Sequence, residues 1–251
     1  MLRRALALFT MLATTGVRCS TGLQLRSASR AAMITRGGKL SASSSSETVG
    51  GPLPKLAVFD MDMCVWSPEM YTLNEVPEVA IRGPLGDAGE GVVAVKSGSD
   101  TIRLFPGALK VLQDYHNGKY PGMRIAAASS ADTPFAVKIA RKALTMLEVV
   151  PGVTVREVFS MGFDVEGGVE NMQIGRTPPL SSNKAKTHFP ILKEQTGVAY
   201  DQMIFFDDCN WGDHCAIVNE AHGVVTQRTP SGLTLQQWEN CLKKFADSKG
   251  S

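Results

Sequence analysis

The stretch that most constrains this chain is a run of four apolar residues, 56–59, that ends directly in Asp60 and Asp62. An uninterrupted apolar run of this length is typical of a strand buried on both faces, as in a parallel sheet covered by helices. Ligands of such sheets bind beyond the carboxyl ends of the strands. Residues two apart on a strand point to the same side, so two like charges converge here. A hard cation such as Mg²⁺ would relieve their repulsion.

A second stretch repeats this pattern, because the apolar residues 203–206 run directly into Asp207 and Asp208. A single acid pair after a strand is equally compatible with a solvated turn. Two pairs that follow two strands of one parallel sheet lie at the same edge and can converge on one metal ion. We therefore expect both pairs to belong to one site.

Apolar runs of strand length alternate with segments of helical periodicity along the chain. Strands are expected at 55–60, 124–130, 155–161, 203–206 and 223–226, and helices at 106–117, 132–147, about 184–197, 211–221 and 233–246. Two short alternating runs, 91–95 and 101–104, predict a β-hairpin insertion. Strands that alternate with helices predict an α/β fold with a doubly wound parallel sheet.

Length and charge indicate one folded domain that follows a basic N-terminal segment. The chain has 251 residues, of which 43% are hydrophobic and 20% charged, as in ordinary globular proteins. Residues 1–46 hold seven of the 26 basic residues and no acid, which leaves 19 basic against 24 acidic residues and a charge of −5 for 47–251. This acidic remainder carries no basic footprint for nucleic acid.

The basic front segment, rich in Arg, Ser, Ala and Thr, has the composition of an organelle transit peptide. Its apolar run over residues 5–17 is too short to span a membrane. We expect residues 1–46 to be a cleaved targeting segment for a plastid or mitochondrion, 47–53 a linker and 54–247 the folded domain. The alternative is a disordered tail without an address, which would leave the protein cytoplasmic.

Four motifs in this order resemble those of the haloacid dehalogenase (HAD) superfamily, and within it the magnesium-dependent phosphatase 1 family. They are Asp60-x-Asp62-x-x-x-Trp66 after the first strand, Ala126-Ala127-Ala128-Ser129, Thr187-His188-Phe189 preceded by a lysine, and Phe205-Phe206-Asp207-Asp208. The resemblance covers roughly residues 54–245. It implies a HAD-like Rossmannoid fold without a cap domain, and therefore an open site.

The resemblance also implies a role for each motif residue. Asp60 would attack phosphorus to form an aspartyl-phosphate, and Asp62 would act as general acid and base. Mg²⁺ would be held by the Asp60 side chain, the Asp62 backbone carbonyl and Asp208, with Asp207 direct or through water. Ser129 would donate hydrogen bonds to the phosphoryl oxygens.

The chain departs from the family pattern at three positions. The family's lysine stands three residues before His188, where this chain has Ala185. Lys184 and Lys186 flank that position, and both remain candidates, with Lys184 slightly favoured. Ser130 stands where an arginine usually follows the serine, so its part in substrate binding is open. Cys64 replaces a threonine, a change that leaves both catalytic acids in place.

Taken together, these features predict a Mg²⁺-dependent phosphomonoesterase. An open site suits a small-molecule phosphate ester, such as a sugar-type phosphate, or a phosphoprotein carrying phosphotyrosine. A phosphotransferase that uses the same intermediate and a catalytically silent phosphate- or metal-binding module are the alternatives. No segment is long and apolar enough to predict a membrane span.

Overall fold

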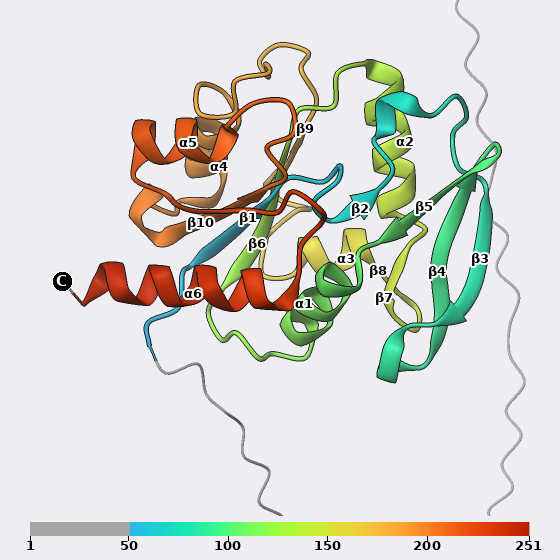
Figure 1. Ribbon diagram of the computed structural model, residues 1–251, viewed down its shortest axis with the longest axis horizontal. Coiled ribbons are helices and arrows are strands. Elements are labelled where there is room, and N and C mark those ends of the chain that lie inside the picture. The colour runs from blue at the N-terminus through green and yellow to red at the C-terminus, as the bar shows by residue number, and fades with distance from the viewer. Residues whose placement is uncertain (1–50, 251) are drawn as a thin grey trace, which may run out of the picture. The chain divides into compact units, whose positions relative to one another are not determined.

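The computed structural model describes residues 51–250, so the targeting segment expected over 1–46 and the first part of the expected linker lie outside the described residues. The central feature of the described chain is a five-stranded sheet in the order β11-β10-β1-β6-β9, in which all neighbours are parallel (Figure 1). Its strands are β1 (Leu56–Phe59), β6 (Arg124–Ser129), β9 (Met172–Ile174), β10 (Met203–Asp207) and β11 (Val225–Arg228).

The register of the sheet brings the carboxyl ends of its central strands to one edge. Phe59, the last residue of β1, pairs with Phe206 of β10 on one side and with Ala127 of β6 on the other. The backbone N–H of Asp60 continues this pattern and donates to the carbonyl of Phe206 at 2.9 Å. The acids at the carboxyl ends of β1 and β10 therefore lie side by side.

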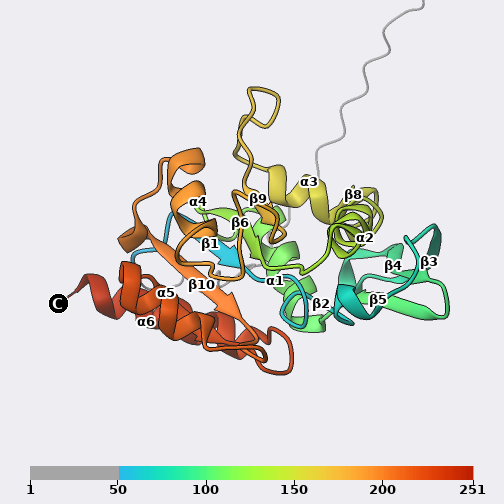
Figure 2. The ribbon, with the colours of Figure 1, turned by 90° about the horizontal axis from the view of Figure 1, so that it is seen from above.

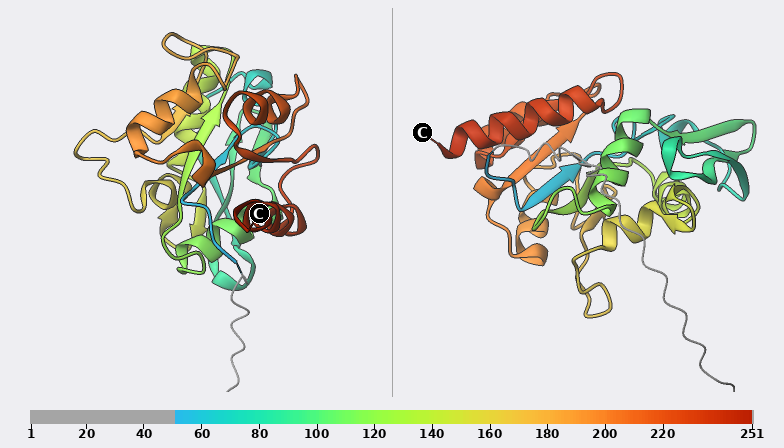
Figure 3. Two further views of the ribbon diagram at one scale, coloured as in Figure 1. Left: turned by 90° about the vertical axis from the view of Figure 1, so that its left-hand side faces the viewer. Right: turned by 90° about the horizontal axis from the view of Figure 1, so that it is seen from below.

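Helices lie on both faces of this sheet (Figures 2 and 3). They are α1 (Pro106–His116), α2 (Pro134–Leu144), α3 (Val155–Ser160), α4 (His188–Thr196), α5 (His214–His222) and α6 (Leu235–Lys249). The predicted doubly wound α/β fold is thus confirmed. Within residues 51–250, no helix combines the length and the apolar character needed to cross a membrane.

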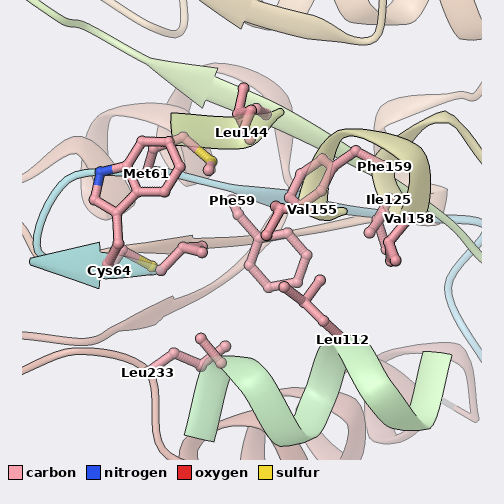
Figure 4. Packing of buried hydrophobic residues seen from close by; sticks show 14 of the residues in the cluster. Phe59, Met61, Cys64, Leu112, Ile125, Leu144, Val155, Val158, Phe159 and Leu233 are labelled. Atoms are coloured by element: carbon pink, nitrogen blue, oxygen red, sulfur yellow. The ribbon is translucent and has the colours of Figure 1, made fainter. Parts of the chain in front are cut away.

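Alternate residues of the buried strands pack into two different clusters, because successive side chains of a strand point to opposite faces. Ala57 and Phe59 belong to a large cluster with α1, α3 and α6, whereas Leu56 and Val58 pack with side chains from α4 and α5. Figure 4 shows the ring of Phe59 among Leu112 of α1 and residues of α3. The continuous apolar run reflects this burial on both sides.

The insertion between β1 and α1 is larger than the predicted hairpin. It is a four-stranded antiparallel sheet in the order β2-β5-β4-β3. Its strands are β2 (Trp66–Ser67), β3 (Val79–Pro84), β4 (Glu90–Ser97) and β5 (Asp100–Leu104), with the 3₁₀ turns Met70–Thr72 and Gly86–Ala88 beside them. The predicted hairpin is β4 and β5. Strand β3 escaped prediction because most of its side chains are exposed and show no alternation of apolar and polar residues.

The prediction of a strand at 155–161 is wrong. This segment is helix α3, which begins in a capping box: the Thr154 hydroxyl accepts from the Glu157 N–H, and the Glu157 carboxylate accepts from the Thr154 N–H. The strands of this region lie earlier, as the hairpin β7 (Glu148–Val150) and β8 (Val153–Thr154). A short apolar run does not distinguish a strand from a buried helix, and here the cap decides.

Two helices begin later than the sequence predicts. Helix α4 begins at His188 rather than near residue 184. A turn precedes it, in which the side chain of Asn183 accepts from the N–H of Lys186. Helix α5 begins at His214 rather than at 211, with the Asp213 carboxylate as its N-cap. The residues before each helix are thereby left in loops at the edge of the sheet.

The aromatic centre of the large cluster predicts a measurable difference between two Phe→Ala substitutions. Phe159 is fully buried and its ring meets Phe59 edge-to-face at 6.1 Å, whereas Phe135 is 43% exposed. We expect Phe159→Ala to lower the free energy of unfolding by about 3–5 kcal/mol. The matched Phe135→Ala should change it by less than about 0.5 kcal/mol. Urea denaturation of both variants measures this, and equal losses would contradict the assignment of the core.

Candidate active site

The carboxyl edge of the parallel sheet opens into a cavity of about 380 Å³. Asp60 and Asp62 after β1, Ser129 at the end of β6 and Asp208 after β10 all line it. Lys184 reaches the same cavity from the loop before α4. The structure therefore brings together residues that lie more than 140 positions apart in the chain.

A buried lysine connects the two acid pairs. The Nζ atom of Lys184 lies 2.9 Å from Oδ1 of Asp60 and 2.6 Å from Oδ2 of Asp207, and the residue is 1% exposed. Burial alone would lower the pKa of Lys184, but the carboxylates of Asp207 and Asp60 outweigh it and raise the pKa above its ordinary value. Lys184 is thus a permanent cation at the floor of the cavity.

The other candidate lysine lies elsewhere. Lys186 is exposed on the turn before α4, and its backbone N–H bonds to Asn183. Ala185, the residue between the two lysines, packs its side chain into the second cluster. The late start of α4 explains why only Lys184 reaches the acids, since the preceding loop turns that side chain inward.

Asp207 and Asp208 are neighbours in sequence but differ in their surroundings. Asp207 is fully buried, and its second oxygen, Oδ1, accepts the backbone N–H of Cys209 at 2.8 Å. Cys209 takes a positive φ of 58°, which turns the chain back around that carboxylate. Asp208 instead faces the cavity, and burial followed by the charge of Asp207 raises its pKa to about 6.

One oxygen of Asp208 indicates whether these residues fit a metal ion. Its Oδ2 atom is buried and has no hydrogen-bond partner within residues 51–250. Oxygens of Asp60, Asp207 and Asp208 all lie within 4.8 Å of one another. An unpaired buried carboxylate oxygen is costly unless it meets a cation. The donor set is entirely carboxylate oxygen and therefore fits a hard divalent ion such as Mg²⁺.

The Asp62 side chain lines the same cavity and is held by two donors. Its Oδ1 accepts the indole N–H of Trp66 at 2.7 Å, and its Oδ2 accepts the backbone N–H of Met70 at 2.9 Å. Burial raises the pKa of Asp62 to about 7 despite these donors. Near neutral pH this carboxyl group therefore exists partly as the acid. Burial also raises the pKa of Asp60, and Lys184 opposes that rise.

Ser129 and Ser130 lie at the end of β6, on the side of the cavity away from β10. Ser129 is buried, and its carbonyl oxygen lies 3.2 Å from Nε2 of His188, the first residue of α4. Ser130 also lines the cavity, and its hydroxyl is buried without a partner among the described residues. Among the described residues, the Ser130 hydroxyl therefore remains available to donate to a ligand.

Part of the cavity wall is aromatic and was not predicted. Trp211 is 71% exposed, and its indole N–H donates to Oε1 of Glu69 at 3.0 Å, while the ring of Tyr71 meets Trp211 edge-on at 6.0 Å. Glu69 and Tyr71 come from a segment without hydrophobic periodicity, so nothing in the sequence pointed to them. Trp211 follows the Asp207-Asp208 pair closely, and a large aromatic residue at such a position is a usable signal.

Comparison with known proteins identifies the family of this site. The chain belongs to the acid phosphatase family, whose sequence profile matches residues 52–248. It is similar to the magnesium-dependent phosphatase 1 of Homo sapiens, with 28% identity over 198 residues that cover 78% of this chain and 90% of that protein. The resemblance to this family of the HAD superfamily is thereby confirmed.

The chain also shows a weak similarity to two solved structures. CbbY from Rhodobacter sphaeroides, in complex with phosphate, is 11% identical with a TM-score of 0.39, covering 69% of this chain and 85% of that one. The N-terminal part of the protein BF1531 from Bacteroides fragilis, which contains a phosphatase domain complexed with Mg, is 15% identical with a TM-score of 0.35. That match covers 79% of this chain and 40% of the other.

The positions of the two lysines predict opposite outcomes of the same substitution. Lys184→Ala removes the cation between two buried carboxylates, so we expect kcat/KM to fall by at least about two orders of magnitude, roughly 2.7 kcal/mol. Lys186→Ala should leave kcat/KM within about threefold of wild type, because exposed lysines interact weakly. Assay of both variants, with circular dichroism to verify folding, decides between them. If neither variant loses activity, another basic residue must balance the charge of the site.

Proposed function

We propose that this protein is a Mg²⁺-dependent phosphomonoesterase that works through an aspartyl-phosphate on Asp60. The observation that carries the proposal is the Asp60–Lys184–Asp207 contact beside an unpaired oxygen of Asp208. It brings together a nucleophile, a fixed cation and a carboxylate oxygen that could bind a metal ion within one cavity. The similarity to a magnesium-dependent phosphatase supports the choice of metal.

The carboxylates of Asp60 and Asp208 would hold the ion, because both oxygens of Asp207 already have partners in Lys184 and Cys209. Mg²⁺ bound there would favour the ionised form of the nucleophile and neutralise charge on the phosphate. Asp62 would contribute no side-chain ligand, since both of its carboxylate oxygens accept protein N–H groups.

The chain's own residues account for the first chemical step. A carboxylate oxygen of Asp60 attacks phosphorus, and the bond from phosphorus to the ester oxygen breaks. The protonated Asp62 gives its proton to the departing oxygen, which leaves as an alcohol. Trp66 and Met70 fix the plane of the Asp62 carboxyl group, while the Ser129 hydroxyl donates to a phosphoryl oxygen.

Hydrolysis of the intermediate uses the same residues. Asp62, now ionised, takes a proton from water as that water attacks phosphorus. The bond between phosphorus and the Asp60 oxygen breaks, and inorganic phosphate leaves. Lys184 remains in contact with Asp60 throughout and opposes the build-up of negative charge.

The open cavity accommodates a range of alcohol groups on the substrate. The aromatic rings of Trp211 and Tyr71 give the mouth of the cavity an apolar contact surface. Aryl phosphates such as phosphotyrosine and ring-shaped sugar phosphates both suit such a surface. We propose these two substrate classes.

The nucleophile assignment predicts a loss of turnover without a loss of fold. Asp60→Asn retains the shape of the side chain but removes the attacking carboxylate, so we expect kcat to fall by about three orders of magnitude or more, roughly 4 kcal/mol. The control Asp100→Asn changes an exposed acid of β5 and should retain wild-type kcat. p-Nitrophenyl phosphate turnover measures both variants, and a substantial rate in a folded Asp60→Asn protein would refute the assignment.

The metal site predicts a dependence on Mg²⁺ that one substitution weakens. Excess chelator should abolish turnover and added Mg²⁺ should restore it. Asp208→Ala removes a carboxylate ligand, so the Mg²⁺ concentration for half-maximal rate should rise by about tenfold or more, corresponding to about 1.4 kcal/mol of binding free energy. Full activity in excess chelator would exclude a metal-dependent reaction.

A further inference from the structure

Three basic side chains face the cavity within the described part of the chain: Lys184, Arg176 and His214. The charge of Lys184 is already shared between two buried carboxylates. Burial and then the neighbouring Lys184 lower the pKa of His214 below its ordinary value, so this ring is mostly neutral at pH 7. Of these three side chains, Arg176 is therefore the one whose positive charge remains available to an anionic substrate.

The backbone holds Arg176 in a defined place. Ile174 at the end of β9 pairs with Ser129 of β6, and the next N–H, that of Gly175, donates to the Ser129 carbonyl at 2.9 Å. The φ of Gly175 is +131°, and a Cβ there would lie 3.2 Å from a methyl group of Val137. A residue other than glycine would be strained here. Arg176 thus follows a fixed turn beside Ser129.

The surroundings of Arg176 leave its charge available. The side chain is exposed, and the structure records no ion pair for it within residues 51–250, although Asp132 lines the same cavity. The residue that follows Ser129 is the uncharged Ser130, whose buried hydroxyl has no partner. On this side of the cavity, positive charge comes from the loop after β9 and not from the residue that follows β6.

We propose that Arg176 is a substrate-binding residue whose guanidinium pairs with an oxyanion of the phosphate ester at the mouth of the cavity. This inference rests on the proposed function. The planar guanidinium matches phosphate and carboxylate oxygens in a bidentate way, which a lysine does not. The oxyanion is either a non-bridging oxygen of the transferred phosphoryl group or a second acidic group on the alcohol part of the substrate.

The test compares Arg176→Ala and Arg176→Lys with a control, Arg141→Ala, an exposed arginine in the last turn of α2. Three probes are used with the Mg²⁺-loaded protein: p-nitrophenyl phosphate, fructose 1,6-bisphosphate and calorimetric titration with inorganic phosphate. Loss of a charged hydrogen bond predicts that KM rises by about 10- to 100-fold in Arg176→Ala. We expect kcat to change little, Arg176→Lys to be intermediate and Arg141→Ala to match wild type.

The three probes separate the sources of the oxyanion. Weaker binding of p-nitrophenyl phosphate and inorganic phosphate identifies the transferred phosphoryl group. Weaker binding of the bisphosphate alone identifies a second acidic group. Unchanged affinity of Arg176→Ala for all three probes, in a wild-type protein that turns over phosphate esters, overturns the inference. A wild-type protein that hydrolyses no ester would instead refute the proposed function.

Discussion

The site depends on one buried ammonium group. Lys184 contacts Asp60 and Asp207 at hydrogen-bonding distance, and without it two carboxylates would lie together in a region that water hardly reaches. Removing one partner of a buried charge pair typically costs about 3–5 kcal/mol. The strands β1 and β10 can therefore end in acids at adjacent positions only because a loop from elsewhere in the chain supplies this cation.

Asp207, the last residue of β10, and Asp208, the residue after it, have different tasks. Asp207 is directed inward, where it orients Lys184 and accepts the N–H of Cys209, whose positive φ turns the chain back. Asp208 is directed into the cavity and retains an oxygen without a partner. One carboxylate thus fixes the position of the lysine, while the next remains open to a metal ion. The acid pair is a structural unit as well as a chemical one.

The parts of the fold that were predictable are those with a strong local pattern. The buried strands β1, β6 and β10 each contain a continuous apolar run, and the polar residues at their carboxyl ends were placed at one edge by the expected parallel pairing. The 155–161 segment was misassigned because the capping box of Thr154 and Glu157 outweighs a short apolar run. The motif alone could not choose between two flanking lysines, because the choice depends on the turn at Asn183 that delays helix α4.

The cavity mouth was beyond prediction for a related reason. Its residues, among them Glu69, Arg176 and Trp211, stand on loops whose conformation no periodic pattern encodes, and they meet only in three dimensions. Their chemistry is nevertheless constrained by the floor of the site. Because the ammonium group of Lys184 is paired with Asp60 and Asp207, it contributes little to binding a second anionic group at the mouth of the cavity. We therefore expect substrate recognition to come from the loops, which can change without disturbing the contacts of the buried Lys184 with Asp60 and Asp207.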